Sequence, residues 1–293
     1  PRRVAATALS LALLSILSAP SLAADDPCIR PDGSSDPAAN TDAGNENGRD
    51  NTTCSTSASA YGIDNKAHSA NSSALGGGNY AHGRRSSAFG AGNTAYGDDT
   101  SAFGFANSVG AVRGSAFGYA NTVGSTWGVA LGSSNISGGV GASAIGHGNI
   151  ASADASSALG FKAYTGTGAF GALAIGGFLD RNADGAANLD IDGNDDGILD
   201  GSSETAAAIG ASSVAIGAGV VARGGHSTAL GVDSVASGTA ASAIGYGNTA
   251  SGLESQALGS YNEATAPNAS AMGRANQAFA NGSSAVGALN TAS

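Results

Sequence analysis

Residues 87–100 read SAFGAGNTAYGDDT and residues 101–114 read SAFGFANSVGAVRG, so the same order of residue types occurs twice in succession. In both segments the motif Ser-Ala-Phe-Gly is followed, three residues after the glycine, by an asparagine, Asn93 or Asn107. Gly90 and Gly104 occupy the same place in the two segments, which makes the repeat length 14 residues. Self-similarity at a short, fixed period indicates a solenoid, in which each coil contacts mainly its two neighbours.

The repeat continues along most of the chain in two series of glycines at 14-residue steps. The residue two positions before each glycine is alanine, and the residue directly before it is large and apolar. These glycines are Gly62, Gly76, Gly90, Gly104, Gly118, Gly132, Gly146 and Gly160, then Gly217, Gly231, Gly245, Gly259, Gly273 and Gly287. The large residues that precede them, called the apolar column below, are Tyr61, Leu75, Phe89, Phe103, Phe117, Leu131, Ile145, Leu159, Ile216, Leu230, Ile244, Leu258, Met272 and Val286.

The period favours two short strands and two tight turns in each coil. Fourteen residues are too few for a pair of helices, and each glycine within a helix costs about 1 kcal/mol relative to alanine. We expect the glycines and asparagines at fixed offsets to supply the left-handed backbone conformations that turns require. Stacked coils then place identical residues about 4.8 Å apart, and the predicted fold is an all-β parallel solenoid of 14-residue turns.

The columns also predict how each coil is lined. The alanine two positions before the glycine and a second alanine five positions after it lie seven residues apart, as Ala88 and Ala95 do. They occupy equivalent places on the two strands, which predicts a narrow roll lined by small residues. Side chains alternate along a strand, so the apolar column lies on the opposite face from the alanines. Which of the two faces is the roll interior and which the subunit contact is left open by the sequence.

A single roll would leave the large side chains of the apolar column in water. Burial of such a side chain contributes about 1.5–3 kcal/mol, and we therefore expect self-association around a central axis, with each copy presenting the same column. The matching column of the second strand, six residues after the glycine, is polar or small and includes His68 and His82. We expect these two histidines to lie on a solvated surface, and weak metal binding is the alternative.

Composition excludes several classes of protein. Of the 293 residues, 149 are Gly, Ala or Ser, which is too many for an ordinary enzyme core. Only 6 are proline, which argues against collagen. The net charge of −10, with no basic stripe, argues against nucleic acid and anionic membrane surfaces as partners. No nucleophile is paired with a base, so we do not expect an enzyme.

The N-terminal residues predict export. Arg2 and Arg3 precede an apolar run over residues 4–17, and small residues at Ser21 and Ala23 are typical of a signal peptide that covers residues 1–23. A transmembrane anchor, the alternative, needs about 20 apolar residues. In the polar segment over residues 24–55 we expect a disulfide between Cys28 and Cys54, since paired cysteines in exported chains are usually bridged. Free thiols or an inter-chain bridge are the alternatives.

An acidic insertion over residues 177–205 interrupts the repeat, and the segments around Ala169–Gly171 and Ala174–Gly176 are off register. It carries two motifs of the form D-x-N-x-D-G-x-x-[ND], which resemble the first half of a calcium loop of the EF-hand or thrombospondin type 3 kind. Ile191 and Ser203 stand where an EF-hand needs a bidentate glutamate, so we expect two small calcium loops and no helix-loop-helix sensor. A solvated acidic loop is the alternative. The candidate Ca²⁺ ligands are Asp180, Asn182, Asp184, Asn188, Asp192, Asn194, Asp196 and Asp200.

The unit S-x-A-[LIF]-G-x-x-N-x-A is similar to the head repeat of YadA-like trimeric autotransporter adhesins. The clearest matches are SSVAIG at residues 212–217 and GVALGSS at residues 128–134, and the resemblance covers residues 56–176 and 206–293. It implies a left-handed parallel β-roll that forms a homotrimer on the outer membrane of a bacterium. It further implies a role in virulence through adhesion to extracellular matrix proteins such as collagen, to other surfaces or to itself.

In that family a stalk and a membrane anchor follow the head. We expect this chain to be truncated before them, so that the membrane is reached only through an anchor outside the sequence. A secreted ice-binding or matrix-forming β-solenoid is the alternative function. The regular T-x-T array expected of an ice-binding solenoid is missing from the repeat.

Overall fold

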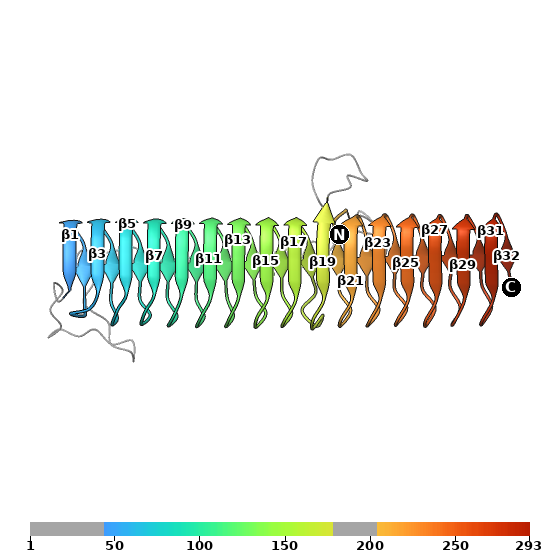
Figure 1. The fold of residues 1–293 in the computed structure, drawn as a ribbon, viewed down its shortest axis with the longest axis horizontal. Coiled ribbons are helices and arrows are strands. Elements are labelled where there is room, and N and C mark those ends of the chain that lie inside the picture. The colour runs from blue at the N-terminus through green and yellow to red at the C-terminus, as the bar shows by residue number, and fades with distance from the viewer. Residues whose placement is uncertain (1–43, 178–203) are drawn as a thin grey trace, which may run out of the picture.

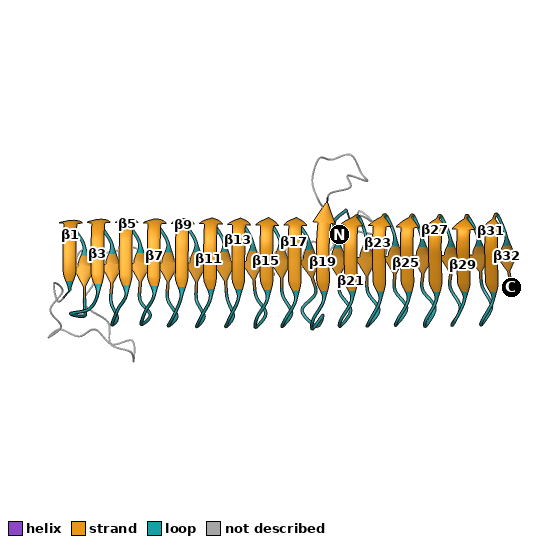
Figure 2. Ribbon diagram, in the orientation of Figure 1, coloured by secondary structure: helices purple, strands orange, loops and turns teal. Residues whose placement is uncertain are grey.

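The computed structural model describes residues 44–177 and 204–293. These residues form 16 coils, each with a long strand and a short strand, and the strands build two parallel 16-stranded sheets. Figure 1 shows the coils in one continuous row, and Figure 2 shows that strands and turns account for the whole described part of the chain. The predicted all-β parallel solenoid is confirmed.

The long strands are five residues long and make up the first sheet, whereas the short strands are two residues long and make up the second. The long strands are β1 (Asn45–Arg49), β3 (Ser59–Ile63), β5 (Ser73–Gly77), β7 (Ser87–Ala91), β9 (Ser101–Phe105), β11 (Ser115–Tyr119), β13 (Val129–Ser133), β15 (Ser143–His147), β17 (Ser157–Phe161), β19 (Leu173–Gly177), β21 (Val214–Ala218), β23 (Thr228–Val232), β25 (Ser242–Tyr246), β27 (Gln256–Ser260), β29 (Ser270–Arg274) and β31 (Ser284–Ala288). The short strands are β2 (Thr52–Thr53), β4 (Lys66–Ala67), β6 (Tyr80–Ala81), β8 (Thr94–Ala95), β10 (Ser108–Val109), β12 (Thr122–Val123), β14 (Ile136–Ser137), β16 (Ile150–Ala151), β18 (Tyr164–Thr165), β20 (Ala207–Ala208), β22 (Val221–Ala222), β24 (Val235–Ala236), β26 (Thr249–Ala250), β28 (Glu263–Ala264), β30 (Gln277–Ala278) and β32 (Thr291–Ala292).

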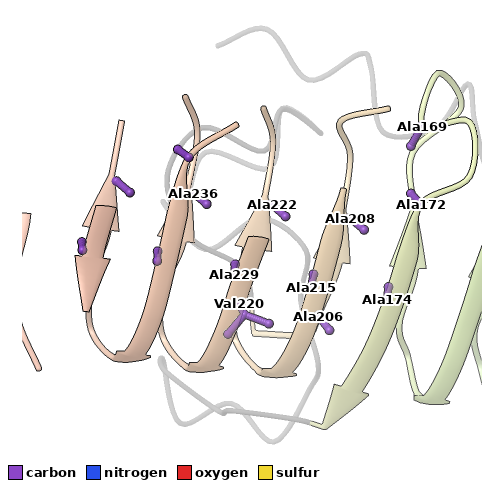
Figure 3. Packing of buried hydrophobic residues seen from close by; sticks show 14 of the residues in the cluster. Ala169, Ala172, Ala174, Ala206, Ala208, Ala215, Val220, Ala222, Ala229 and Ala236 are labelled. Atoms are coloured by element: carbon purple, nitrogen blue, oxygen red, sulfur yellow. The ribbon is translucent and has the colours of Figure 1, made fainter. Parts of the chain in front are cut away.

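The interior of the roll is lined by the two alanine columns. Ala88 on β7 and Ala95 on β8 are both buried, and equivalent alanines are buried in nearly every coil. Figure 3 shows this repetition through β19–β24, where Ala174, Ala215 and Ala229 lie on successive long strands. The alanine face is therefore the roll interior, and the apolar column lies on the outside.

Where the interior residues are larger, their neighbours are smaller. Val109 and Val123 replace alanine on β10 and β12, and the adjacent turn positions are Gly114 and Gly128. A Cβ atom on Gly114 would lie 2.8 Å from a methyl group of Val109 and 2.9 Å from one of Val123. The narrow interior thus keeps a nearly constant packed volume from coil to coil, as close packing requires.

Two ladders of asparagine side chains connect adjacent coils, and all their members except Asn51 and Asn290 at the ends are buried. The Nδ2 of Asn107 donates to the carbonyl of Phe103 at 2.9 Å in its own coil and to the carbonyl of Gly118 at 2.8 Å in the next coil. The Oδ1 of Asn93, in the preceding coil, accepts from the backbone N–H of Asn107 at 3.0 Å. One ladder is formed by Asn51, Asn65, Asn79, Asn93, Asn107, Asn121, Asn135 and Asn149, and a second by Asn248, Asn262, Asn276 and Asn290.

The role predicted for these asparagines is wrong. The column glycines do have positive φ values, as predicted, but they lie within the long strands and not in the turns. Gly104 has a φ of 119°, and a Cβ atom there would lie only 2.1 Å from the carbonyl oxygen of Gly118. The left-handed turn positions are instead the residue before each ladder asparagine and one residue in the opposite turn, such as Ala106 (φ 55°) and Arg113 (φ 60°). Their N–H groups donate to carbonyls of the preceding coil, at 2.9 Å for both residues, which offsets the strain of that conformation.

The roll differs from the sequence repeat at two places. It begins at β1, within the segment expected to be polar and outside the roll, because Gly48 and Asn51 already occupy the glycine and asparagine columns. The segment Ala174–Gly176, expected to be off register, pairs in register with both β17 and β21. The two extra residues that precede it are accommodated in the turn between β18 and β19. The undescribed residues 178–203 separate β19 from β20.

We expect the substitution Asn107→Ala to destabilise the roll by about 2–3 kcal/mol, because it leaves buried carbonyl groups in two coils without their donor. Denaturant unfolding followed by circular dichroism measures the change. The control is Asn71→Ala, since Asn71 is exposed and Ala155 occupies the same turn column with a φ of 54°. Equal losses of stability in the two variants would contradict the role of the ladder.

Candidate functional site

The outward face of the long strands is the largest apolar surface of the roll. In β11, Ser115, Phe117 and Tyr119 point outward while Ala116 is buried, and the same alternation recurs in the other long strands. The structure places all thirteen residues from Leu75 to Val286 of the predicted column on this face. Each of them is exposed or half-buried in the single chain.

The apolar column forms a continuous ridge along the roll. Leu75 is 46% exposed and Leu131 45% exposed, so a single chain covers neither. Phe103 lies 4.8 Å from Phe89 and 5.1 Å from Phe117, measured between ring centroids. Near its N-terminal end the face is hollowed, and Ser59, Tyr61, Ser73, Ala74, Leu75 and Phe89 line the hollow.

The column also continues past the place where the sequence repeat is interrupted. Ile175 on β19 is paired with Leu159 on one side and Ile216 on the other. Ile175 is missing from the predicted column, because the two extra residues before it shift it out of the 14-residue count. The outward face is therefore one unbroken surface across both blocks of the repeat.

The surface prediction for His68 is wrong. Its side chain is only 5% exposed, because the ring of Tyr80 packs against it at 4.8 Å between centroids. The hydroxyl of Tyr80 lies 3.2 Å from His68 Nδ1. His82 is half-buried and stacks on Tyr96 at 4.4 Å. The four rings form a ladder on the outward face of the short strands, which we call the His–Tyr ladder, and tyrosine packing accounts for the burial that the repeat pattern did not predict.

Ion pairs connect the turns that precede the long strands. Arg84 donates to Asp98 through its backbone N–H at 2.8 Å and through Nε at 3.1 Å. These hydrogen bonds, led by the backbone one, lower the pKa of Asp98. The neighbouring Arg85 donates to Asp99 Oδ2 at 2.8 Å and likewise lowers the pKa of that carboxyl. In the next coils of the same column the guanidinium of Arg113 lies over the ring of Trp127.

Other aromatic residues gather where the long strands end. Phe105 and Tyr119 stack at 5.5 Å, and Tyr246 and Tyr261 meet edge to face at 5.1 Å. The hydrogen bond between the two tyrosines raises the pKa of Tyr261. Sequence reasoning missed these pairs, although the 14-residue step from Phe105 to Tyr119 was a signal for the first of them.

The predicted calcium ligands from Asp180 to Asp200, the signal peptide and Cys28 lie outside the described residues. The Cys28–Cys54 disulfide therefore stays a prediction. Within residues 44–177 and 204–293, no group of three or more His, Cys, Asp or Glu side chains is placed to hold a metal ion. The described part of the chain also contains no helix that is long and apolar enough to cross a membrane.

Six segments of the roll match the family model of the YadA head domain repeat, and this model spans two copies of the repeat. Every matched segment begins at the inner residue of a short strand, as at Ala81 and Ser137, and so spans two coils in structural register. No curated protein matches the chain. The matched segments are residues 81–107, 137–163, 208–234, 222–248, 236–262 and 264–290.

We expect the His–Tyr ladder to make the roll less stable in mild acid. Burial lowers the pKa of His82 from its ordinary 6.5, so the folded chain binds this proton less readily than the unfolded chain. The stability contributed by the neutral ring is present above pH 6.5 and is lost as the pH falls through the lowered pKa. The variant His82→Tyr, which repeats the tyrosine found at Tyr96 in the same column, should lose less stability between neutral pH and pH 5.

The measurement is denaturant unfolding of both proteins at the two pH values. Asp98 and Asp99 do not obscure it, because their lowered pKa values place their titration below the ordinary carboxyl value of 3.8. An NMR titration of His82 with a pKa at or above 6.5 would show that burial does not control its protonation.

Proposed function

Because the roll of this chain is a YadA-like head domain, we propose that it is the head of a trimeric adhesin displayed on a bacterial surface. Heads of this family are adhesive domains rather than catalytic ones. The observation that carries the proposal is the continuous apolar column on the outward face of the long strands, in which Leu75 and Leu131 remain exposed in a single chain.

Threefold assembly would cover this column with copies of itself. In a closed threefold ring the three copies are related by rotation, so the same strip of each copy faces the common axis. The column is straight, because the parallel strands pair residue for residue at every coil, as Phe103 does with Phe117. Three straight columns can therefore pack against one another along the whole length of the roll, with the narrow alanine interior of each copy left undisturbed.

Adhesion would follow from repetition and trimerisation together. Each coil offers a similar outer surface, and three rolls side by side present it three times. Several weak contacts that engage at once raise the apparent affinity by about 10²–10⁴ over a single contact. The family favours extracellular matrix proteins such as collagen, other surfaces, or a second adhesin as targets.

The substitution Leu131→Asp tests assembly and adhesion together. An aspartate on the outward face would place three carboxylates near the trimer axis, so we expect a monomer in size-exclusion chromatography. Retention on collagen-coated or chain-coated surfaces should then fall by about 10²-fold or more, since avidity is lost. The matched control is Ser108→Asp, an exposed position on the outward face of a short strand, which should keep both properties.

A monomeric Leu131→Asp variant that adheres as well as the unaltered chain would show that adhesion does not need the trimer. An unaltered trimer that adheres to none of the coated surfaces would contradict the adhesin proposal. The secreted structural solenoid would then be the better explanation of the repeat.

We also propose that the acidic insertion binds Ca²⁺ through its two Asp- and Asn-rich motifs. The proposal rests on the sequence, because all eight candidate ligands lie outside the described residues. Residues 180–204 carry eight acids and one arginine, and a bound cation would offset the repulsion among the carboxylates. Alternate carboxylate and amide oxygens followed by a turn glycine are the ligand pattern that Ca²⁺ prefers.

Isothermal titration of the full chain with CaCl₂ should show saturable uptake at or below about millimolar concentration, the range of extracellular calcium modules. The double variant Asp184→Asn and Asp196→Asn should weaken uptake, because it removes one carboxylate from each motif. Asp50→Asn, at an exposed turn of the roll, is the control and should leave uptake unchanged. Absence of uptake by the unaltered chain at millimolar Ca²⁺ would refute the calcium proposal.

A further inference from the structure

Trp127 is the only tryptophan in the chain, and it is held in an unusual position. It lies in the turn that precedes β13, and 55% of its surface is exposed. Its φ of 59° is in the left-handed region, which bulky residues rarely adopt. The backbone N–H of Trp127 donates to the carbonyl of Val112 at 3.2 Å, which ties the residue to the preceding coil. A large aromatic side chain is thus presented to solvent from a defined backbone.

The two faces of the indole have different surroundings. The guanidinium carbon of Arg113, one coil earlier, lies 5.8 Å from the ring centroid and covers one face. One coil later the same turn position is Gly141, which has no side chain. A Cβ atom built on Gly141 would meet no other atom within 4 Å, so the space beside the indole on that side is open.

The open space has the thickness of one flat ring. The next side chain in this turn column is that of Ala155, two coils beyond Trp127. Coils that stack as parallel strands lie about 4.8 Å apart, so the levels of Trp127 and Ala155 are about 10 Å apart. A planar or chair-shaped ring in van der Waals contact with the indole occupies a separation of this size.

A carboxylate lies at the edge of the same space. The Oδ1 of Asp154 accepts from the backbone N–H of Val140 at 2.8 Å, so the carboxylate reaches back to the coil of Gly141. A carboxylate has about four acceptor positions, and one hydrogen bond leaves it able to accept others. Val140 is itself exposed and adds apolar surface next to it. We call Trp127, Val140, Gly141 and Asp154 the indole shelf.

We propose that the indole shelf binds a neutral pyranose ring of an oligosaccharide. The C–H-rich face of the sugar packs on the open face of Trp127, over Gly141, and a hydroxyl group donates to Asp154. The inference deepens the proposed adhesin function by naming a class of ligand, and in a trimer the shelf is present three times, which adds avidity.

The size and charge of the shelf favour a sugar over other ligands. The exposed apolar side chains of the shelf are Trp127 and Val140, with Val112 beside them, and together they fall far short of the roughly 800 Å² per partner that a stable protein interface buries. A polyanion is disfavoured by Asp154 and by the net charge of −10. Of the nearby cations, Arg84 and Arg85 are paired with aspartates, and Arg113 lies over the opposite face of the indole.

Tryptophan fluorescence tests the proposal directly, because the single indole makes the emission a report on the shelf alone. The full chain is titrated with cellohexaose, maltohexaose and chitohexaose. We expect a saturable change in emission with at least one of them. Trp127→Ala, followed by calorimetry with the same sugar, should weaken binding by at least about tenfold, as loss of a central aromatic contact does.

The variant Gly141→Arg separates the shelf from a structural effect. Arg113 shows that this turn column accepts arginine at a φ of 60°, close to the 67° of Gly141, so the roll should fold. The new side chain would cover the open face of the indole, and the saturable fluorescence change should be lost. The matched control is Gly92→Arg, since Gly92 has a φ of 63°, has open space around it and lies in the opposite turn. It should bind as the unaltered chain does.

The proposal is overturned if none of the three sugars gives a saturable change, or if Gly141→Arg binds as tightly as the control. It is also overturned if acrylamide fails to quench the emission of the sugar-free chain, because the indole is then covered by another copy. If the sugars fail while the unaltered chain still adheres to coated surfaces, the shelf is wrong and the adhesin function stands. Sugar binding by a chain that adheres to no surface would support the shelf and contradict the adhesin function.

Discussion

The buried asparagine amide is the side-chain interaction that organises most of the roll. An amide inside a ladder, such as that of Asn107, hydrogen-bonds to its own coil, to the preceding asparagine and to a glycine carbonyl in the following coil. The glycine column lets the backbones approach closely enough for these bonds, since a Cβ atom at Gly104 would collide with the next carbonyl. In-register strand pairing, which also holds in the coils that have Ala206, Val220 or Ser234 in the asparagine column, aligns the apolar ridge, the His–Tyr ladder and the ion pairs of the turns.

The distribution of apolar residues is the reverse of that in an ordinary globular domain. The interior contains mostly alanine, which buries little area, while the large side chains lie on the outside. Hydrophobic stabilisation is therefore small within one chain and becomes large only when the outward ridge is covered. If copies of the roll associate through this ridge, assembly and burial of the ridge are one process. The turn that carries Trp127 lies outside the ridge and is exposed in the single chain.

The sequence alone predicts the period, the two strands of each coil and the alanine lining, because one residue type recurs at each of these positions. It does not reveal the coil at β1, where Glu46 and Asn47 replace the alanine and the apolar residue and only the glycine and asparagine columns remain. It also misassigns the asparagines. Asparagine is common in left-handed turns, and only the three-dimensional arrangement shows that these amides are buried and bonded across coils.

The candidate sites also differ in whether the sequence alone predicts them. The apolar ridge is predictable, since each of its members precedes a column glycine. The burial of His68 is not, because it depends on Tyr80 in the next coil and on the side to which that ring turns. The indole shelf is defined by the missing side chain at Gly141, one repeat after Trp127. The sequence shows both residues, but only the stacking of the coils shows that they are neighbours.

The central claim is that copies of the roll associate side by side through the outward ridge. Small-angle X-ray scattering of the unaltered chain, combined with native mass spectrometry, tests it most directly. We expect three times the mass of one chain and a rod with the length of a single roll, about 75 Å for 16 coils at strand spacing. A monomer at all concentrations, or an end-to-end assembly longer than one roll, would contradict it.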